Sequence, residues 1–182
     1  PLALFLLLST SLLPVPAGAQ EGPRAVPEAD PIDVRSVDAI VAAVYDVISG
    51  PAGQERDWDR WRSLFIPQAR LIAMGPNPDG SVGHRVMTPE EYVEQSGPFL
   101  LENGFFEEEI GRTQEEFGPL VHLFSAYQSK RAQDDPEPFA RGINSFQLMN
   151  DGNRWWVVTI LWTSERPDLP IPPRYLGGGL DR

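Results

Sequence analysis

Apolar residues recur every three or four positions in two stretches near the start of the chain, which is the spacing of one helix face. The first helix is expected to begin after Ser36, a residue that caps helices well, and to end at Gly50-Pro51. The second is expected to begin after Asp57 and to close before Pro67. Their apolar faces are Val37, Ile40, Val41, Val44 and Ile48 in the first helix, and Trp58, Trp61, Leu64 and Phe65 in the second.

A short hairpin and a third helix are predicted next. Residues 69–74 have the pattern of a strand, residues 76–83 that of a turn-rich loop, and residues 84–87 can return antiparallel to the strand. Thr88-Pro89-Glu90-Glu91 combines a capping residue, a proline at the first helical position and a capping-box glutamate, so a helix is expected to begin there. Gly97-Pro98 is expected to interrupt it.

Four β-type stretches follow, over residues 105–115, 120–131, 142–150 and 154–164, and Asp151-Gly152 is expected to turn the chain between the last two. Side chains alternate between the two faces of a strand. One face of the third stretch therefore carries Asn144, Phe146 and Leu148. In the last strand, alternation places Trp156, Val158, Ile160 and Trp162 opposite Trp155, Val157, Thr159 and Leu161. Both faces of that strand are apolar.

A sheet that is apolar on both sides needs a cover on each side. The order of elements predicts an α+β domain in which three N-terminal helices pack on one face of a curved antiparallel sheet. For the outer face we expect a second subunit, in a homodimer that covers Trp155, Val157 and Leu161.

The first 19 residues have the pattern of a signal peptide. An apolar run from Leu2 to Leu13 is too short to cross a bilayer, and Ala17-Gly18-Ala19 forms a small-residue cleavage site before Gln20. We therefore expect a signal peptide over 1–19, a Pro-rich linker over 20–33, the domain over 34–166 and an extended tail over 167–182. The mature protein is expected to be secreted or periplasmic, without a membrane span.

The charge and the amino-acid composition of the chain argue against some classes of partner and of metal site. The formal net charge of −11 repels phosphate backbones, so nucleic acid is not expected as a partner. The chain has no cysteine, which excludes disulfides and thiolate metal sites, and its two histidines, His84 and His122, are far apart in the sequence. We expect neither a metal nor a cofactor.

Several segments, in order, resemble the nuclear transport factor 2-like (SnoaL-like) superfamily over about residues 34–165, and more narrowly a group of its bacterial members. These segments are Gly104-Phe105-Phe106-Glu107-Glu108-Glu109-Ile110, Val121-His122-Leu123-Phe124-Ser125-Ala126-Tyr127, Arg141-Gly142-Ile143-Asn144-Ser145-Phe146-Gln147-Leu148, Asp151-Gly152-Asn153-Arg154-Trp155-Trp156 and Pro170-Ile171-Pro172-Pro173-Arg174-Tyr175-Leu176. The resemblance implies a cone in which three helices lean on a bent sheet around a cavity. It leaves function open, because this fold serves isomerases, dehydratases, hydrolases and binding modules.

The superfamily's steroid isomerases allow a residue-by-residue comparison. The resemblance brings Tyr45 to their helix-one tyrosine, Asn144 to their later hydrogen-bond donor, and Ala73 to the aspartate that serves as base. Because alanine cannot accept a proton, steroid-isomerase chemistry is not expected. The arginine and paired aspartates of the related epoxide hydrolases also lack a counterpart, since Gly142 and Ile143 follow Arg141.

Three functional classes stay open from the sequence. The leading hypothesis is capture of a small, largely apolar ligand in a cavity lined by Tyr45, Trp61, His122, Asn144, Phe146 and Trp162. The second is a lyase or isomerase acting on a carbonyl compound, with His122 or Glu109 as the base and with Tyr45 and Asn144 stabilising an oxyanion. The third is an interaction module that uses the outer face of the sheet. The run Glu107-Glu108-Glu109 alternates in facing, so at least one glutamate is expected to point inward.

Overall fold

The computed structural model describes residues 25–177. The expected signal peptide, the first residues of the expected linker and the end of the tail lie outside this range. The elements, in chain order, are α1 (Pro31–Val34), α2 (Val37–Ile48), α3 (Trp58–Ser63), β1 (Phe65–Pro76), β2 (Val82–Met87), α4 (Pro89–Glu102), β3 (Phe106–Phe117), β4 (Leu120–Lys130), β5 (Ala140–Asn150), β6 (Trp155–Ser164) and the 3₁₀ turn η1 (Pro173–Tyr175).

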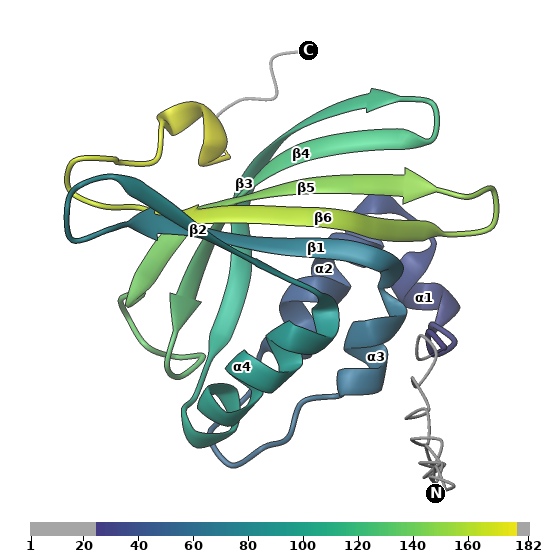
Figure 1. Ribbon diagram of the computed structural model, residues 1–182, viewed down its shortest axis with the longest axis horizontal. Helices are drawn as coiled ribbons and strands as arrows, with labels where there is room; N and C mark the ends of the chain where they lie inside the picture. Colours follow the sequence, from purple (N-terminus) through teal and green to yellow (C-terminus); the bar gives the residue numbers. More distant parts are fainter. Residues whose placement is uncertain (1–24, 178–182) are drawn as a thin grey trace, which may run out of the picture.

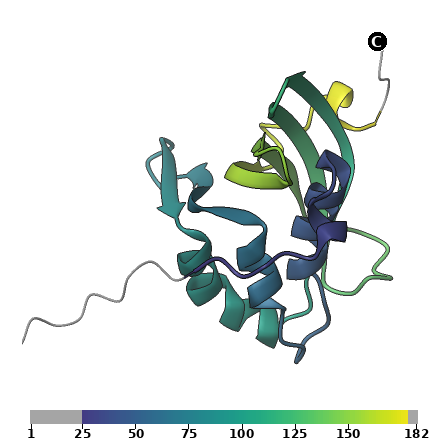
Figure 2. The same cartoon turned by 90° about the vertical axis from the view of Figure 1, so that its right-hand side faces the viewer.

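All six strands form one sheet in the order β2-β1-β6-β5-β4-β3. The expected α+β class is confirmed, with one correction. The sheet is mixed, because β6 returns beside β1 and runs parallel to it, while every other neighbouring pair is antiparallel. Figure 1 shows α2, α3 and α4 together on one side of the sheet and the C-terminal segment with η1 on the other side. Figure 2 shows, in a view turned by 90°, how the strands bend.

The helices begin where local sequence signals place them. The side chains of Ser36 and Asp57 accept hydrogen bonds from backbone N–H groups in the first turns of α2 and α3. Thr88 and Glu91 form a complete capping box at the start of α4. These contacts satisfy donors that the first turn of a helix leaves without partners, so the three starting points were readable from the sequence.

Two predicted helix ends differ from the structure. The second helix stops at Ser63, and Phe65 already belongs to β1. The third runs through Pro98 to Glu102, although a proline inside a helix costs about 3 kcal/mol. Tertiary packing offsets this cost, since Leu100 in the last turn is buried in the core.

The short helix α1 packs on the domain, although it lies at the end of the expected linker. Asp33 is buried, and both of its carboxylate oxygens accept hydrogen bonds from Arg60, at 2.7 and 3.0 Å. Arg60 also pairs with Asp46 on α2, so its guanidinium joins α1, α2 and α3. Ordered packing therefore extends to Ala29, which is buried as well.

An irregularity in β6 changes which side chains face the core. Gln147 pairs with Thr159 but Leu148 pairs with Val157, so Val158 is an extra residue and the alternation shifts there. Val157 is 0% exposed, and Trp155 packs against the core. The predicted dimer surface of Trp155, Val157 and Leu161 is therefore wrong, because only Leu161 lies on the outer face.

Part of the outer face is covered by the chain itself. Ile171 is buried, and the Tyr175 ring stacks on Phe124 at 5.6 Å between centroids. An apolar pocket of about 230 Å³ lies between this segment and the sheet, and Leu161 lines it. Homodimerisation stays a prediction. A dimer interface on the outer face would have to lie outside the part that this C-terminal segment covers.

Candidate functional site

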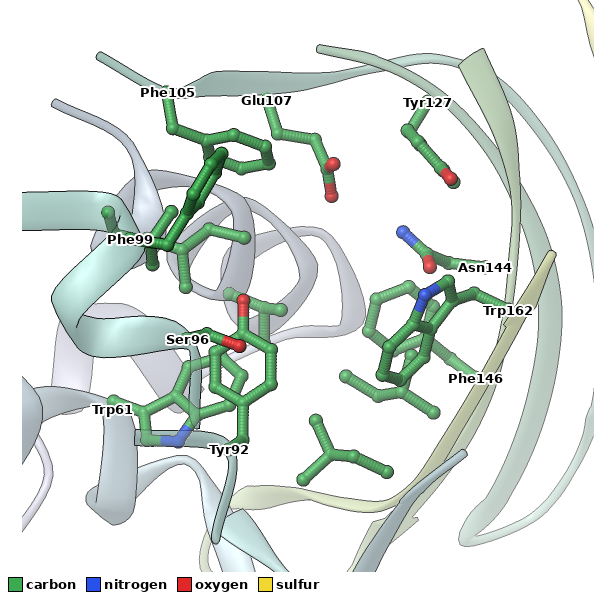
Figure 3. Close-up of a pocket in the computed structure, with 15 residues that line it drawn as sticks. Trp61, Tyr92, Ser96, Phe99, Phe105, Glu107, Tyr127, Asn144, Phe146 and Trp162 are labelled. Carbon is green, nitrogen blue, oxygen red and sulfur yellow. The ribbon is translucent and has the colours of Figure 1, made fainter. Parts of the chain in front are cut away.

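A cavity of about 270 Å³ lies between the helices and the concave face of the sheet. We call it the cone cavity. Its wall is largely aromatic and aliphatic, with a few polar groups at one end (Figure 3). It is lined by Val44, Ile48, Trp61, Leu71, Tyr92, Ser96, Phe99, Leu100, Phe105, Glu107, Tyr127, Asn144, Phe146, Ile160 and Trp162.

Four of the side chains expected at the cavity lie on its wall: Trp61, Asn144, Phe146 and Trp162. Asn144 and Trp162 are direct neighbours across the β5–β6 ladder, so they face the same way. Trp61 is held from behind by a hydrogen bond from its indole N–H to the Pro89 carbonyl, at 3.1 Å. The sequence therefore predicted this part of the wall, because alternation is regular along β5 and Trp162 lies beyond the β6 irregularity.

His122, which was expected to line the cavity, does not lie on its wall. Its neighbours Val121 and Leu123 are fully buried in the core, so His122 points to the outer face of β4. There its ring Nε2 lies 3.1 Å from Ser145 Oγ, and its ring meets Phe124 edge-on. His122 is separated from the cone cavity by the sheet and contacts nothing in it.

Glu107 is the glutamate that enters the cone cavity. It pairs with Ser129 across β3 and β4, and Ser129 Oγ donates to its carboxylate at 2.8 Å. Burial raises the pKa of Glu107 to about 7, although hydrogen bonds from Ser129 and Asn144 act in the opposite direction. Glu108 faces outward, where Gln128 donates to it. The alternation of the glutamate run was visible in the sequence, but its phase was not, because β3 has an extra residue at Ile110.

Glu109 ends a directed chain of hydrogen bonds beside the cavity. Asn144 Nδ2 donates to the Tyr45 hydroxyl at 3.1 Å, and this hydroxyl lies 2.7 Å from Ser125 Oγ. Ser125 Oγ donates to Glu109, whose other oxygen pairs with Arg112 at 2.9 Å. A serine hydroxyl has one hydrogen. Since Ser125 gives that hydrogen to Glu109, Tyr45 must be the donor to Ser125.

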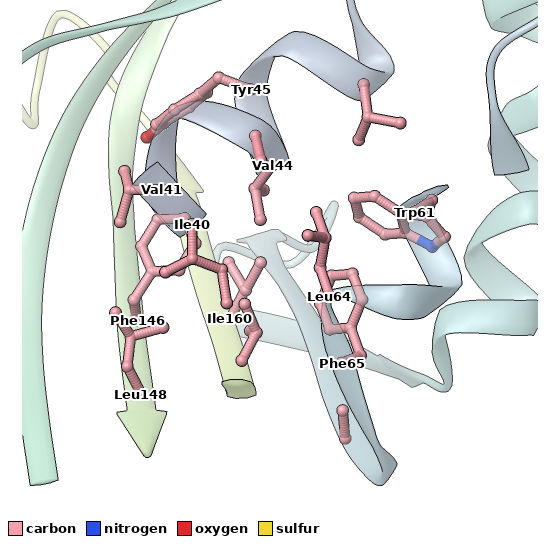
Figure 4. Close-up of a cluster of buried hydrophobic side chains, with 14 of the residues drawn as sticks. Ile40, Val41, Val44, Tyr45, Trp61, Leu64, Phe65, Phe146, Leu148 and Ile160 are labelled. Atoms are coloured by element: carbon pink, nitrogen blue, oxygen red, sulfur yellow. The ribbon is translucent and has the colours of Figure 1, made fainter. Parts of the chain in front are cut away.

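This direction decides what Tyr45 can do. Its single hydroxyl hydrogen points to Ser125, and its lone pair accepts from Asn144. Figure 4 shows the ring projecting from α2 with its oxygen directed at the sheet. Burial also raises the pKa of Tyr45 far above its ordinary value, so it stays neutral. Tyr45 therefore supports Asn144 from behind and has no donor left for an oxyanion in the cavity.

A second, polar depression adjoins the cone cavity, and we call it the polar groove. It measures about 450 Å³ and runs between α2 and β3. Glu107 lines both spaces, so its carboxyl lies at their boundary. The groove is lined by Asp38, Val41, Ala42, Tyr45, Asp46, Ser49, Phe106, Glu107, Glu108, Glu109, Arg112, Lys130 and Gln133.

The position that aligns with the isomerase base is apolar in the structure too. Ala73 on β1 pairs with Trp162 on β6 and packs against the core. Within residues 25–177, no three histidine or carboxylate side chains come close enough together to hold a metal ion. In the same range no helix has the length and apolarity that a membrane crossing needs.

No protein-family model and no curated protein matches the sequence. Three solved structures are similar in chain path. One is an NTF2-like protein of unknown function from Silicibacter pomeroyi, with a TM-score of 0.46 at 11% identity over 72% of this chain and 94% of that chain. Another is an NTF2-like protein of unknown function from Shewanella baltica, with a TM-score of 0.41 at 12% identity over 72% and 98%.

The third is a protein from Kribbella flavida provisionally named a ketosteroid isomerase, with a TM-score of 0.41 at 13% identity over 79% of this chain and 87% of that chain. At identities this low the likeness concerns the fold and says nothing of ligands or chemistry. Helices leaning on a bent sheet around a cavity are what the sequence resemblance implied, and the structure has this arrangement, with the sheet left open between its edge strands β2 and β3.

Proposed function

We propose that the protein binds a small, largely apolar molecule in the cone cavity. The observation that carries this proposal is a cavity of about 270 Å³ inside the fold, with aromatic walls and few polar groups. Ligand sites are typically concave and apolar, with a small number of polar groups that orient the ligand. Here Asn144 and Glu107 are such groups.

The rigidity of the wall supports binding. Trp61 stacks on Tyr92 at 4.7 Å and meets Phe65 at 4.5 Å between ring centroids. Aromatic pairs at these distances hold each other in place. A ligand that enters therefore meets a preformed surface and loses little affinity to ordering of the protein.

The test is to fill the cavity from α4. Ser96 lines the cone cavity, and Ser96→Phe would place a ring in it. Glu94 is exposed on the same helix, so Glu94→Phe is the matched control. We expect propylbenzene, titrated by calorimetry, to bind the original protein and the control but not Ser96→Phe. Equal binding to both variants would show that the apolar ligand lies elsewhere.

One observation favours a second candidate, acid–base catalysis. Glu107 faces the cavity with a pKa of about 7, which suits a group that takes up and releases a proton near neutrality. In a lyase or isomerase acting on a carbonyl compound, Glu107 would take the role first given to His122 or Glu109. A deuterium-exchange assay on acetophenone and related ketones, with Glu107→Gln as the inactive variant, tests this candidate.

We also infer that the domain is exported, on the pattern of residues 1–19. Expression with this segment in a bacterium that has a periplasm should yield a secreted or periplasmic protein that begins at Gln20. Intact-mass measurement of the exported fraction checks the cleavage site.

A further inference from the structure

The polar end of the cone cavity offers hydrogen-bond acceptors. The two N–H groups of the Asn144 amide are directed to Tyr45 and Glu107. Among residues 25–177 no hydrogen bond reaches its carbonyl oxygen, and Figure 3 shows the nitrogen on the side of Glu107 and the oxygen toward Trp162 and Phe146. The Glu107 carboxylate itself is an acceptor when ionised.

The hydrogen-bond chain explains why the amide has this orientation. An amide turned by half a rotation would place its oxygen against the Tyr45 hydroxyl. That hydroxyl already gives its hydrogen to Ser125, so two acceptors would face each other. Glu109, which pairs with Arg112, is the last acceptor in this series of hydrogen bonds. It therefore fixes the direction of each bond and so determines which atom of the Asn144 amide faces the cavity.

The Glu107 carboxyl has no cationic partner in the part of the chain that the structure describes. None of the ion pairs found within residues 25–177 involves it, and its hydrogen bonds come from the neutral side chains of Ser129 and Asn144. A buried carboxylate is stable when a positive charge pairs with it. The described residues supply none at this position, so Glu107 can pair with a positive charge that arrives with the ligand.

We propose, building on ligand capture in the cone cavity, that the ligand is a hydrophobic amine whose ammonium group lies between the Glu107 carboxylate and the Asn144 carbonyl oxygen. An ammonium has only donors, which matches two acceptors. Its apolar part packs against aromatic walls that include Trp162, Phe99 and Phe105. Ring faces also attract a cation within about 6 Å.

The acidity of the whole protein favours the same class. A net charge of −11 raises the local concentration of cations and lowers that of carboxylic acids. Tyr127 on β4 also lines the cavity, and a phenol hydroxyl can accept from an ammonium as well as donate. An anionic ligand would have to lie beside the Glu107 carboxylate and the Asn144 carbonyl oxygen, and the negative charge on these oxygens would repel it.

The titratable groups that face Glu107 are three phenols. They are Tyr45 on α2, Tyr92 on α4 and Tyr127 on β4, and burial raises the pKa of each. They stay neutral through the range in which Glu107 titrates. Arg112 and Lys130 line the polar groove on the other side of Glu107, together with Glu109. Glu107 is therefore the group in the cavity wall that changes charge near neutrality.

The experiment compares three ligands of equal size: phenethylamine, phenethyl alcohol and propylbenzene. Binding to the intact protein is measured by calorimetry from pH about 5 to about 8. An alkylammonium keeps its proton in this range, as a lysine side chain does. We expect phenethylamine affinity to rise with pH, by up to about tenfold per unit, and to level off above the Glu107 pKa of about 7. Propylbenzene should show the opposite slope, because ionised Glu107 loses solvation when an apolar ligand covers it.

Glu107→Gln is the test variant, and Glu108→Gln on the outer face is the matched control. We expect Glu107→Gln to lower phenethylamine affinity at pH about 8 by about thirtyfold or more. Propylbenzene affinity should rise in the same variant, because no charged carboxylate is left to lose its solvation. Glu108→Gln should change neither. Melting curves of both variants check that they are folded.

The outcomes separate this inference from ligand capture itself. If propylbenzene binds but phenethylamine binds no better at pH about 8, the amine assignment is wrong and the apolar cavity proposal stands. A phenethylamine affinity that falls as pH rises, or that survives Glu107→Gln, also overturns the assignment. If none of the three ligands binds, both proposals fail.

Discussion

Tyr45 on α2 and Ser125 on β4 are 80 residues apart in the sequence, and their hydroxyl oxygens lie 2.7 Å apart in the core. The contact joins the buried face of α2 to the inner face of β4. It also transmits the orientation of the Glu109–Arg112 ion pair to Asn144, and through Asn144 to the cone cavity. A structural contact therefore decides which atom of the Asn144 amide faces the cone cavity.

The first prediction concerns this contact. Tyr45→Phe leaves Ser125 without its donor and Asn144 without an acceptor, and unmade buried hydrogen bonds cost about 1 to 3 kcal/mol. We expect a loss of that size in the free energy of unfolding, measured with urea. In a double-mutant cycle with Ser125→Ala, the two losses should not add, because both variants remove the same bond. Additive losses would mean that the hydroxyls do not interact in solution.

The second prediction is a pH dependence of stability caused by Glu107. The unfolded chain releases this proton near pH 4.5, while the folded protein keeps it to about pH 7. Between these values the folded state binds more protons, so this group makes the free energy of unfolding fall as pH rises. Its stabilising contribution is complete below about pH 4.5 and lost above about pH 7.

Glu107→Gln isolates this effect from that of the other carboxyl groups. We expect the difference in unfolding free energy between the variant and the original protein to favour the variant more strongly as pH rises from about 5 to about 8. Urea titrations at several pH values measure it. A difference that stays constant over this range would show that Glu107 titrates at its ordinary pKa.

A third prediction concerns Asn144→Leu. The leucine fits the apolar wall, but the substitution removes the hydrogen bonds that Asn144 donates to Tyr45 and to Glu107. We expect a stability loss of about 1 to 3 kcal/mol and a rise in the Glu107 pKa, because hydrogen bonds from Asn144 lower it. NMR titration of the Glu107 side-chain carboxyl carbon reads the second effect directly, and an unchanged titration midpoint would contradict it.

The fourth prediction concerns Arg56, which is only 6% exposed. Its guanidinium donates to the backbone carbonyls of Ile48, Gly50, Gln54 and Leu100, and so joins the end of α2 to the end of α4. An ammonium cannot span these directions. Arg56→Lys should therefore destabilise by about 2 to 4 kcal/mol.

Arg85→Lys is the control, because Arg85 is exposed and bonds to one glutamine. It should change the free energy of unfolding by less than about 0.5 kcal/mol. Equal effects of the two variants in urea unfolding would rule out a special role for Arg56.

The fifth prediction concerns the segment that covers the outer face. Truncation after Pro167 uncovers the apolar surface around Phe124, Ile143 and Leu161. Exposed apolar surface of this kind favours association. We expect light scattering to show a larger mass for this truncation than for one after Gly177, which keeps the stacked Tyr175. Identical masses for the two proteins would mean that the segment does not control assembly.

Local signals in the sequence were enough to predict α2, α3, the start of α4 and the order of the strands. Ser36, Asp57 and Thr88 cap helices by contacts within one turn, and Asp151-Gly152 closes its hairpin within a few residues. Such signals need no distant partner, so they can be recognised in the sequence. The regular alternation along β5 is a local signal of the same kind, and it places Asn144 and Phe146 together on the inner face.

Which side chains meet in the cone cavity depends on how the strands pair. The extra residues at Ile110 and Val158 shift the alternation, because one inserted residue turns every later side chain to the other face. His122 lies outside the cone for a related reason, since the phase of β4 depends on its partners in the sheet. Contacts between residues far apart in the chain also decide three other features. These are the inward position of Glu107, the direction of the Tyr45 hydrogen bond and the continuation of α4 through Pro98. A local sequence pattern does not contain such contacts.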